Sequence, residues 1–407
     1  MPGALSNIRV LDLSRVLAGP WCGQILADLG AEVIKIERPG TGDDTRGWGP
    51  PYLKDADGND TSESAYYLCA NRGKKSVTLN IATSEGQEIV RKLAAKCDVL
   101  IENYKVGTLA KYGLGYDDLR TVNPGLVYCS ITGFGQTGPY RDRAGYDYIV
   151  QGMGGLMSIT GERDDRPGGG PQKVGVAVAD LTTGLYATIG ILAALNHRNL
   201  TGLGQQVDLG LLDTQVAMLA NVGQSYLATG IAPQRLGNAH PSIVPYNVFR
   251  TRDGHIILAV GNDQQFAAFC ELAGQPLLAT DARFATNRAR VQHRETLMSL
   301  LEALMIERDS REWLAALEAA GVPAGPINTL DRVYADPQIQ AREMLVDVPH
   351  PLAGHATLTA NPLKLSATPP AYHLPPPLLG EHTRDVLGQL LGMSGTDMDS
   401  LAQKNII

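Results

Sequence analysis

Cysteine is scarce in this chain, and no two cysteines have the spacing of a metal or redox motif. The 407 residues include 5 cysteines, an odd number, and no CxxC pair occurs. This usage argues against a disulfide framework and against a zinc site, and it favours a reducing compartment. We therefore expect each cysteine to be a small buried apolar residue, and the protein to be cytoplasmic.

Excess basic charge is also missing, and so are clustered histidines. The chain carries 35 basic and 42 acidic side chains, a net charge of −7, whereas a nucleic-acid-binding protein is usually basic overall. Its 8 histidines form no HExxH motif and no close pair, so we expect no metal. We also find no signal-peptide core and no apolar stretch near the ~20 residues of a membrane span. Nucleic acid and membrane are therefore not expected partners.

Two phosphate and nucleophile motifs are absent, and the one glycine motif that is present lacks the right context. There is neither a GxxxxGK[ST] loop nor a GxSxG elbow. Gly133–Gly138 satisfies G-x-G-x-x-G after a predicted strand, but a dinucleotide-binding fingerprint opens a helix directly. Here Pro139–Gly145 follows, without an apolar helical face. We interpret the motif as a flexible loop at the carboxyl end of a strand, where α/β sheets bind ligands.

What the chain does have is the composition and the alternation of an α/β protein. Hydrophobic residues make up 44% and charged residues 19%, and the length favours two or three domains. In the first third, strands alternate with helices, which predicts a mostly parallel sheet covered by helices. Ser84 is the expected N-cap of one helix. The predicted strands are Ile8–Leu13, Glu32–Glu37, Val99–Glu102 and Leu126–Ile131, and the helices are Pro20–Leu29 and Ser84–Cys97.

The middle of the chain changes character. Helical patterns cover Asp180–Leu195 and Leu209–Leu227, and a loop follows at Gln234–Ser242. Asn247–Phe249 and His255–Val260 then form a predicted hairpin, and helical patterns continue through Ala320. We expect a second, smaller α+β domain here. The tail is rich in proline from Pro349, so Pro369–Pro377 is neither helix nor central strand, and a short helix is predicted at Glu381–Leu391.

Two charged residues stand at positions that suit ligand chemistry. Asp180 ends the apolar run Gly175–Ala179 and begins a predicted helix, so it is either a structural N-cap or a reactive carboxylate. A helix N-terminus would stabilise its charge and offer amides to a nearby oxyanion. Arg38 directly follows the strand that ends at Glu37, a sheet-end position suited to phosphate contact.

An ordered set of segments resembles the class III CoA-transferase family, the group of formyl-CoA transferase and carnitine CoA-transferase. Each segment is weak evidence alone, but the ordered set is specific and covers essentially the whole chain. The segments are Val10–Pro20, Gly30–Pro39, Gly42–Arg46, Asn71–Ser76, Glu102–Tyr104, Thr132–Pro139, Asp180–Gly184, Val322–Pro326 and Leu378–Thr383.

The resemblance implies an architecture that composition and periodicity do not reveal. Both termini build a large α/β domain with an open parallel sheet, a smaller α+β domain lies between two linkers, and two chains form an interlocked homodimer. The boundaries that we assign are 1–205 for the first part of the large domain, 206–235 and 331–355 for the linkers, 236–330 for the small domain, and 356–407 for the C-terminal return.

The resemblance also implies that Asp180 is a covalent nucleophile. A carboxylate attacks the thioester carbonyl and releases CoA thiolate, and the resulting anhydride is attacked by that thiolate or by an acceptor acid. The partners implied are an acyl-CoA and a small carboxylic acid. No cofactor is needed beyond coenzyme A as a substrate, and no metal.

Residues for coenzyme A are carried over by position. Val16, Leu17 and Ala18 are implied to line the CoA channel, and Arg38 to contact the nucleotide end. Other CoA-contact positions match Arg72, Asn103, Tyr104, Lys111 and Phe134. The formyl-CoA enzyme has Gln in place of Leu17 and a longer glycine loop in place of Gly237–His240, so formyl or oxalate specificity is not expected.

Within the family, four segments resemble the succinyl-CoA:glutarate and succinyl-CoA:hydroxymethylglutarate branch: Thr45–Pro51, Arg143–Asp147, Gly237–Tyr246 and Gly261–Phe266. This implies a dicarboxylate acceptor such as glutarate and succinyl-CoA as donor. Arg46 is our candidate for the acceptor's far carboxylate, with a structural ion pair to Asp43 or Asp44 as the alternative. The other candidates for substrate binding are Tyr146, Gly237, Asn238 and His240.

Three other functions compete with this interpretation. In the α-methylacyl-CoA racemase branch, a histidine base stands where this chain has Tyr146, whose reference pKa of about 10 makes it a poor α-proton base. A non-catalytic acyl-CoA-binding protein and an NAD-linked dehydrogenase are the remaining alternatives. A protein that only binds acyl-CoA would bind CoA but never exchange label between CoA esters and free acids. A dehydrogenase would shift in melting temperature with NAD but not with CoA.

Overall fold

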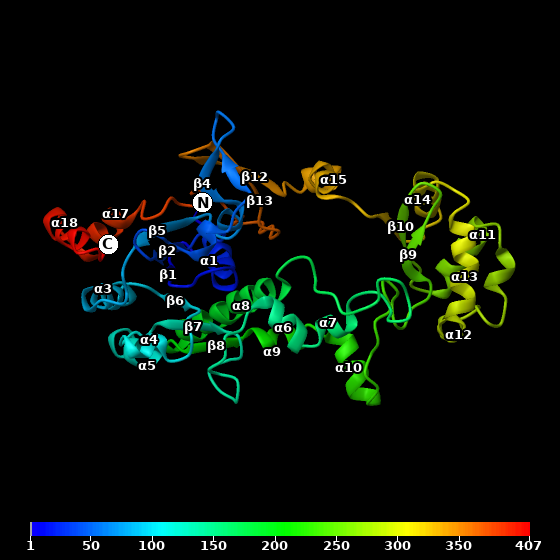
Figure 1. Cartoon of the computed structure of the whole chain (residues 1–407), viewed down its shortest axis with the longest axis horizontal. Helices are drawn as coiled ribbons and strands as arrows, with labels where there is room; N and C mark the ends of the chain where they lie inside the picture. Colours follow the sequence, from blue (N-terminus) through cyan, green and yellow to red (C-terminus); the bar gives the residue numbers. More distant parts are fainter. Residues whose placement is uncertain (1) are drawn as a thin grey trace. The chain divides into compact units, whose positions relative to one another are not determined.

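The computed structural model describes residues 2–407, which form two compact units (Figure 1). Unit 1 combines the residues up to Leu156 with Val174–Gln224 and Pro337–Ile407. Unit 2 combines Met157–Lys173 with Ser225–Asp336. The short segment 157–173 thus belongs to the second unit, although the boundaries assigned from sequence keep it in the first.

A six-stranded sheet forms the centre of unit 1, in the order β5-β2-β1-β6-β7-β8. Every neighbouring pair is parallel, as the alternation of strands and helices predicts. Strand order changes direction at β1, which lies between β2 and β6, and open α/β sheets bind ligands at such a switch point. The strands are β1 (Arg9–Asp12), β2 (Glu32–Glu37), β5 (Lys74–Thr78), β6 (Val99–Glu102), β7 (Val127–Thr132) and β8 (Gln206–Gly210).

Each face of this sheet packs against its own helical layer. Val10, Val33 and Ile101 belong to one buried cluster, which includes residues of α1 (Ala18–Asp28) and α8 (Val178–Thr201). Leu11, Ile34 and Leu100, which point to the other face, join a second cluster with α3, α5 and the C-terminal helices. Those helices are α3 (Ser84–Ala94), α5 (Tyr116–Val122), α17 (Thr383–Leu391) and α18 (Gly395–Gln403).

Helix α8 corrects one statement of the sequence analysis. It is long and apolar enough to cross a membrane by length and composition, although we had found no such stretch. Residues such as Ala187 and Ile191 on its inner side are fully buried in the cluster with α1. The core helix of a globular unit can also have this length and apolar composition. Because its inner side is buried against α1, we assign α8 to the core of unit 1.

The remaining elements of unit 1 surround the sheet. They are η1 (Asp44–Gly47), β3 (Tyr52–Lys54), β4 (Asp60–Ser64), α2 (Ala65–Leu68), α4 (Thr108–Lys111), α6 (Asp147–Met153), α9 (Leu211–Ala217), α16 (Pro337–Ala341), β12 (Leu345–His350) and β13 (Gly354–Thr359). Two further helices, α7 (Leu156–Ile159) and α10 (Ala220–Thr229), have residues in both units. In the antiparallel pair β12–β13, β12 lies in the segment that we had assigned as the second linker, and β13 extends into the C-terminal return.

Unit 2 has a three-stranded antiparallel sheet in the order β11-β10-β9, packed against helices. The predicted hairpin is present as β9 (Tyr246–Arg250) and β10 (His255–Ala259), with β11 (Ala324–Pro326) added at one edge. Its core includes Phe249, Phe269 and Trp313. The helices are α11 (Asp263–Leu272), η2 (Pro276–Ala279), α12 (Asn287–Gln292), α13 (Arg294–Met305), α14 (Ser310–Ala319) and α15 (Leu330–Ala335).

Several local predictions fail, each for a physical reason. Thr83, not Ser84, caps α3, because its hydroxyl accepts a hydrogen bond from the Gly86 amide. The stretch Leu209–Leu227 is not one helix: its first residues complete β8, and two short helices follow. Cys69 is exposed rather than buried.

Candidate active site

A cavity of about 620 Å³ opens at the carboxyl edge of the unit 1 sheet. Its walls come from the segments that follow β1, β6 and β7, together with the start of α8. It therefore lies at the switch point of strand order, where the fold alone predicts a ligand. Its lining includes Arg15, Val16, Leu17, Ala18, Asp44, Trp48, Asn103, Tyr104, Lys105, Arg141, Arg143, Tyr146 and Asp180.

Asp180 stands in the first turn of α8 and lines this cavity. It is not the N-cap, since that position is Ala177, which has no capping side chain. Burial of the carboxyl group, and after it the negative charge of Asp147, raise the pKa of Asp180 to about 7. Among the described residues, none donates a recorded hydrogen bond or ion pair to its side chain, which distinguishes it from a structural carboxylate.

Side chains from β2 and from the segments that follow β2 and β6 hold the loop between β1 and α1. Asn103 accepts a hydrogen bond from the Arg15 amide at 2.9 Å and donates to the Arg15 carbonyl at 2.6 Å. Lys35 donates to the Ser14 carbonyl at 2.9 Å, and Asp43 accepts from the Val16 amide at 3.2 Å. Val16 has a positive φ of 71°, which a β-branched residue keeps only when its surroundings enforce it. The wall formed by Val16, Leu17 and Ala18 is thus rigidly positioned.

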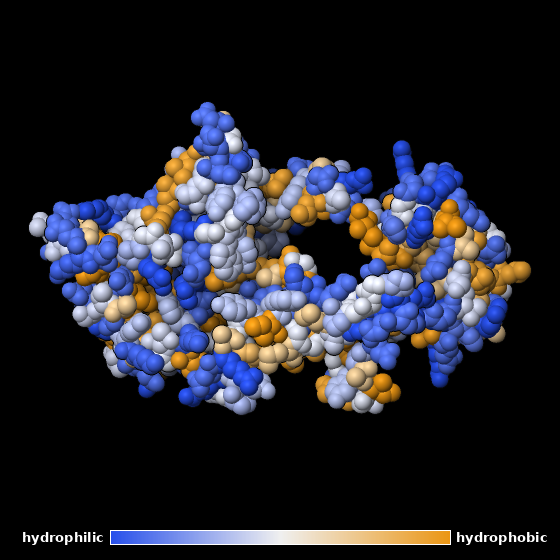
Figure 2. Space-filling view, in the orientation of Figure 1, coloured by the Kyte–Doolittle hydropathy of each residue, from blue (hydrophilic) through white to orange (hydrophobic). Residues whose placement is uncertain are grey.

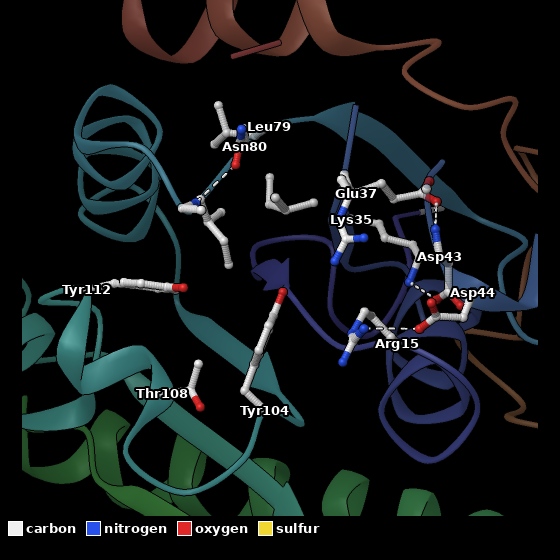
Figure 3. A pocket seen from close by; sticks show the side chains of 15 residues that line it. Arg15, Lys35, Glu37, Asp43, Asp44, Leu79, Asn80, Tyr104, Thr108 and Tyr112 are labelled. Carbon is white, nitrogen blue, oxygen red and sulfur yellow. Dashed lines mark hydrogen bonds and ion pairs between the residues drawn. The ribbon is translucent and has the colours of Figure 1, made fainter. Parts of the chain in front are cut away.

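A second cavity, of about 140 Å³, adjoins the first and is shown in Figure 3. Arg15, Asp44 and Tyr104 line both cavities, so the two share these side chains as a common wall. In Figure 3 the Tyr104 and Tyr112 side chains lie to one side, and Arg15 is joined to Asp44. Arg38, an exposed cation for which no ion pair is recorded among the described residues, also lines this smaller cavity.

One wall of the smaller cavity was missed by sequence reasoning. Leu79–Ala82 follows β5, a strand that the pattern did not predict, and these four residues line the cavity. The signal that could have found them is the same as for Arg38, namely their position just beyond the carboxyl end of a parallel strand.

Arg46 and Arg72, two predicted ligand contacts, are structural in this fold. Arg46 is buried, and its guanidinium is ion-paired with Glu37 at 2.8 Å and Glu63 at 3.3 Å. The ion-pair alternative therefore describes Arg46 better than carboxylate binding, although its partners are not Asp43 or Asp44. Arg72 makes two hydrogen bonds to Asp28, at 2.8 and 2.7 Å. Neither arginine lines either cavity.

The remaining predicted residues are distributed over both units. Tyr146 lines the larger cavity and is 63% exposed. Phe134 packs edge-on against Tyr140, with ring centroids 5.7 Å apart, and Lys111 is exposed at the end of α4; neither lines a cavity. Gly237, Asn238 and His240 belong to unit 2, where the His240 ring lies 5.3 Å from that of Tyr246.

Comparison with known proteins identifies related chains over nearly the whole length. A family model described as "CoA-transferase family III" matches residues 5–383. The succinate–glutarate CoA-transferase of Agrobacterium fabrum is 53% identical over 386 residues, which is 95% of both chains. The human succinyl-CoA:glutarate CoA-transferase is 43% identical over 99% of this chain and 90% of its own. A CAIB/BAIF family protein from Brucella suis has a similar structure, with a TM-score of 0.84, 48% identity, and coverage of 96% of this chain and all of its own.

Proposed function

The chain belongs to CoA-transferase family III, and on that premise we propose that it transfers coenzyme A from succinyl-CoA to glutarate, with Asp180 as the nucleophile. The observation that carries the mechanism is the carboxyl group of Asp180, which lines a ligand-sized cavity and has no recorded partner among the described residues. The names of the relatives above support the choice of donor and acceptor.

The proposed reaction has four balanced steps. The Asp180 carboxylate attacks the succinyl carbonyl, which gives a mixed anhydride and CoA thiolate. The thiolate then attacks the Asp180 carbonyl, releasing succinate and leaving an aspartyl-CoA thioester. Glutarate attacks that thioester, so that a glutaryl–aspartyl anhydride forms and thiolate leaves again. Attack of the thiolate on the glutaryl carbonyl gives glutaryl-CoA and restores Asp180.

Only ionised Asp180 can start this sequence. Because the pKa of Asp180 is raised to about 7, the carboxyl group is only partly ionised at neutral pH. The raised value also makes the carboxylate a stronger nucleophile, because basicity and nucleophilicity rise together. We therefore expect kcat/KM for acyl-CoA to fall as the pH drops below about 7.

The acceptor's far carboxylate needs a cation, and Arg46 is occupied by Glu37 and Glu63. Two other arginines line the cavity of Asp180. Arg141 contacts Asp142 only at 3.6 Å with both groups exposed, and Arg143 stacks on Tyr140 at 3.9 Å. We assign the far carboxylate to Arg143, because Arg141 already lies near Asp142, whereas no ion pair is recorded for Arg143 among the described residues. A guanidinium can bind a carboxylate through two hydrogen bonds. The smaller cavity, with Arg38, would take the nucleotide end of coenzyme A.

The homodimer and the cytoplasmic location expected from the sequence remain proposals. Unit 1 exposes an apolar face on α6, α8 and α9, and apolar residues are visible over these helices in Figure 2. A second copy would cover this face, since a soluble monomer rarely exposes large contiguous apolar area. Its exposed residues include Tyr148, Ile149, Met153, Leu185, Tyr186, Ile189, Leu192 and Val216. Light scattering that gives the mass of one chain at nanomolar concentration would contradict the dimer.

The proposed function is tested with a panel of acceptors and succinyl-CoA, followed by mass spectrometry of the CoA products. Glutarate should turn over, whereas butyrate and valerate should turn over much more slowly, because they lack the second carboxylate that Arg143 would bind. Arg143→Ala should raise the KM for glutarate about ten- to hundredfold and should also raise that for succinyl-CoA, because both acyl groups end in a carboxylate. Equal turnover of butyrate and glutarate would contradict the dicarboxylate assignment.

Hydroxylamine added with succinyl-CoA should modify Asp180, and an unmodified Asp180 would contradict the mechanism.

A further inference from the structure

The first turn of α8 is held by a chain of side-chain hydrogen bonds that centres on Asp147. One carboxylate oxygen of Asp147, at the start of α6, accepts a hydrogen bond from the Ala179 amide at 2.8 Å. The other accepts from the Gln151 side-chain amide at 2.7 Å. Gln151 is fully buried, and its oxygen accepts from the Val174 amide at 2.9 Å. This chain thus fixes the backbone at both ends of the segment that leads into Asp180.

From this geometry we infer that Asp147 is a positioning residue for the transfer reaction: it anchors the turn that carries Asp180 and places a fixed negative charge beside it. The inference rests on the proposed function, because it presumes that Asp180 is the nucleophile. Asp147 is not among the residues that line the cavity of Asp180. It acts through the Ala179 amide, one peptide bond from Asp180, and through space.

A second contact holds the opposite side of the same turn. The Thr183 hydroxyl, one helical turn after Ala179, is 2.6 Å from the Thr214 hydroxyl of α9 and also donates to the Ala179 carbonyl. Ala179 is therefore fixed through its amide by α6 and through its carbonyl by Thr183. Because both the amide and the carbonyl of Ala179 are restrained, the backbone that carries the Asp180 side chain has a defined position.

The charge of Asp147 is the only charge recorded as acting on Asp180 among the described residues. Two N–H donors bind Asp147, and the ionised carboxylate accepts such bonds best. Its repulsion adds to burial in raising the pKa of Asp180. Other charged or titratable groups face the same cavity: Asp44 of η1, Tyr146 before α6, and the cations Arg15, Lys105, Arg141 and Arg143. Tyr66 of α2 also interacts with Asp180: burial, and after it the charge of Asp180, raise the pKa of Tyr66 to about 12.

Asp147→Asn and Asp147→Ala separate the charge from the anchor. Asparagine keeps an oxygen for the Ala179 amide but removes the charge, so the acid limb of kcat/KM for succinyl-CoA should move about 1 pH unit lower. Alanine removes the anchor as well, so kcat at pH 8 should also fall about ten- to hundredfold. Gln151→Met is the matched control: it breaks the hydrogen-bond chain but keeps the charge, and the acid limb should stay in place.

Hydroxylamine labelling of the wild type separates this inference from the proposed function. If wild-type Asp180 is not labelled, the proposed function fails and Asp147 has no nucleophile to position. If it is labelled, and both Asp147 variants keep the wild-type pH profile and kcat, the inference is overturned. Melting temperatures identify a variant that fails to fold, in which case Asp147→Glu, which keeps the charge but shifts the anchor, should lower kcat without moving the acid limb.

Discussion

The walls of the two adjoining cavities hold buried carboxyl groups in opposite ways. On the β2 side, burial alone would raise the pKa of Asp43, but Lys35 and hydrogen bonds from Thr45 outweigh it and hold that pKa at about 2. On the α8 side, Asp180 meets burial and a like charge, and its pKa rises to about 7. The difference teaches that a carboxylate with a complete set of partners stabilises the fold, whereas one without partners is available for chemistry.

The strongest test of this comparison is Asp180→Asn. We expect transfer to fall at least about a thousandfold, because the amide cannot form an anhydride. The free energy of unfolding should stay equal or rise at neutral pH, since a buried carboxyl group without partners is replaced by a neutral amide. Steady-state kinetics and urea unfolding measure the two effects. Loss of stability with activity retained would reverse the roles that we assign to the two walls.

Lys35→Met breaks the paired side instead. It leaves Asp43 buried without the cation at 2.8 Å, and removal of one partner from such a pair costs about 3–5 kcal/mol. Urea unfolding at pH 7 checks the loss. The double variant Lys35→Met/Asp43→Leu should recover much of it, because the stranded charge is gone. A single variant as stable as the wild type would show that the pair does not hold this wall.

Glu102 extends the comparison to a carboxyl group near the cavity but outside its lining. Burial raises its pKa to about 7 against hydrogen bonds from Ser130 and the Tyr104 amide. Because the folded-state pKa lies above the unfolded one, its protonated form favours folding at low pH, and this contribution is lost as the pH rises from about 4.5 to 7. Glu102→Gln should therefore gain roughly 2–3 kcal/mol at pH 8 and little at pH 4.5. Urea unfolding curves of the variant and the wild type at pH 8 and pH 4.5 measure this difference in the free energy of unfolding.

The same contrast applies to arginine, with a smaller expected effect. Arg38 has no recorded ion pair among the described residues and lines a cavity, whereas Arg46 is buried between two glutamates. Arg38→Ala should raise the KM for succinyl-CoA about ten- to hundredfold without changing that for glutarate, the loss of a guanidinium–phosphate contact being worth roughly 1.5–3 kcal/mol. An unchanged KM for succinyl-CoA would place Arg38 outside the nucleotide site.

Sequence reasoning succeeds where the signal is local. The strands Glu32–Glu37 and Val99–Glu102 are predicted to the residue. Each is an apolar run that ends in a glutamate at the carboxyl end of the sheet, and this pattern is recognisable without knowledge of the neighbouring strands. The position of Asp180 after an apolar run is equally local. The resemblance to the family, not the pattern, distinguishes its reactive role from that of a cap.

What the sequence could not predict depends on residues far apart in the chain. The partners of Arg46 include Glu63 and the Pro377 carbonyl, and no spacing rule connects them. The contact of Asp147 with the Ala179 amide likewise joins two segments that only the fold brings together. The same limit explains Leu79–Ala82: the preceding strand β5 begins with two lysines, and only the fold shows that Lys74 is buried against Asp12.

The C-terminal segment of unit 1 has a consequence for the order in which the protein is made. The Ile406 carbonyl accepts a hydrogen bond from the Asn80 amide at 2.7 Å, and the His382 amide donates to the Ser76 carbonyl at 2.9 Å. Asn80 lines the cavity beside Arg38, so a wall of the site is supported by residues that leave the ribosome after unit 2. During synthesis the N-terminal strands must wait for this support, and such long-range closure is slow and favours chaperone binding.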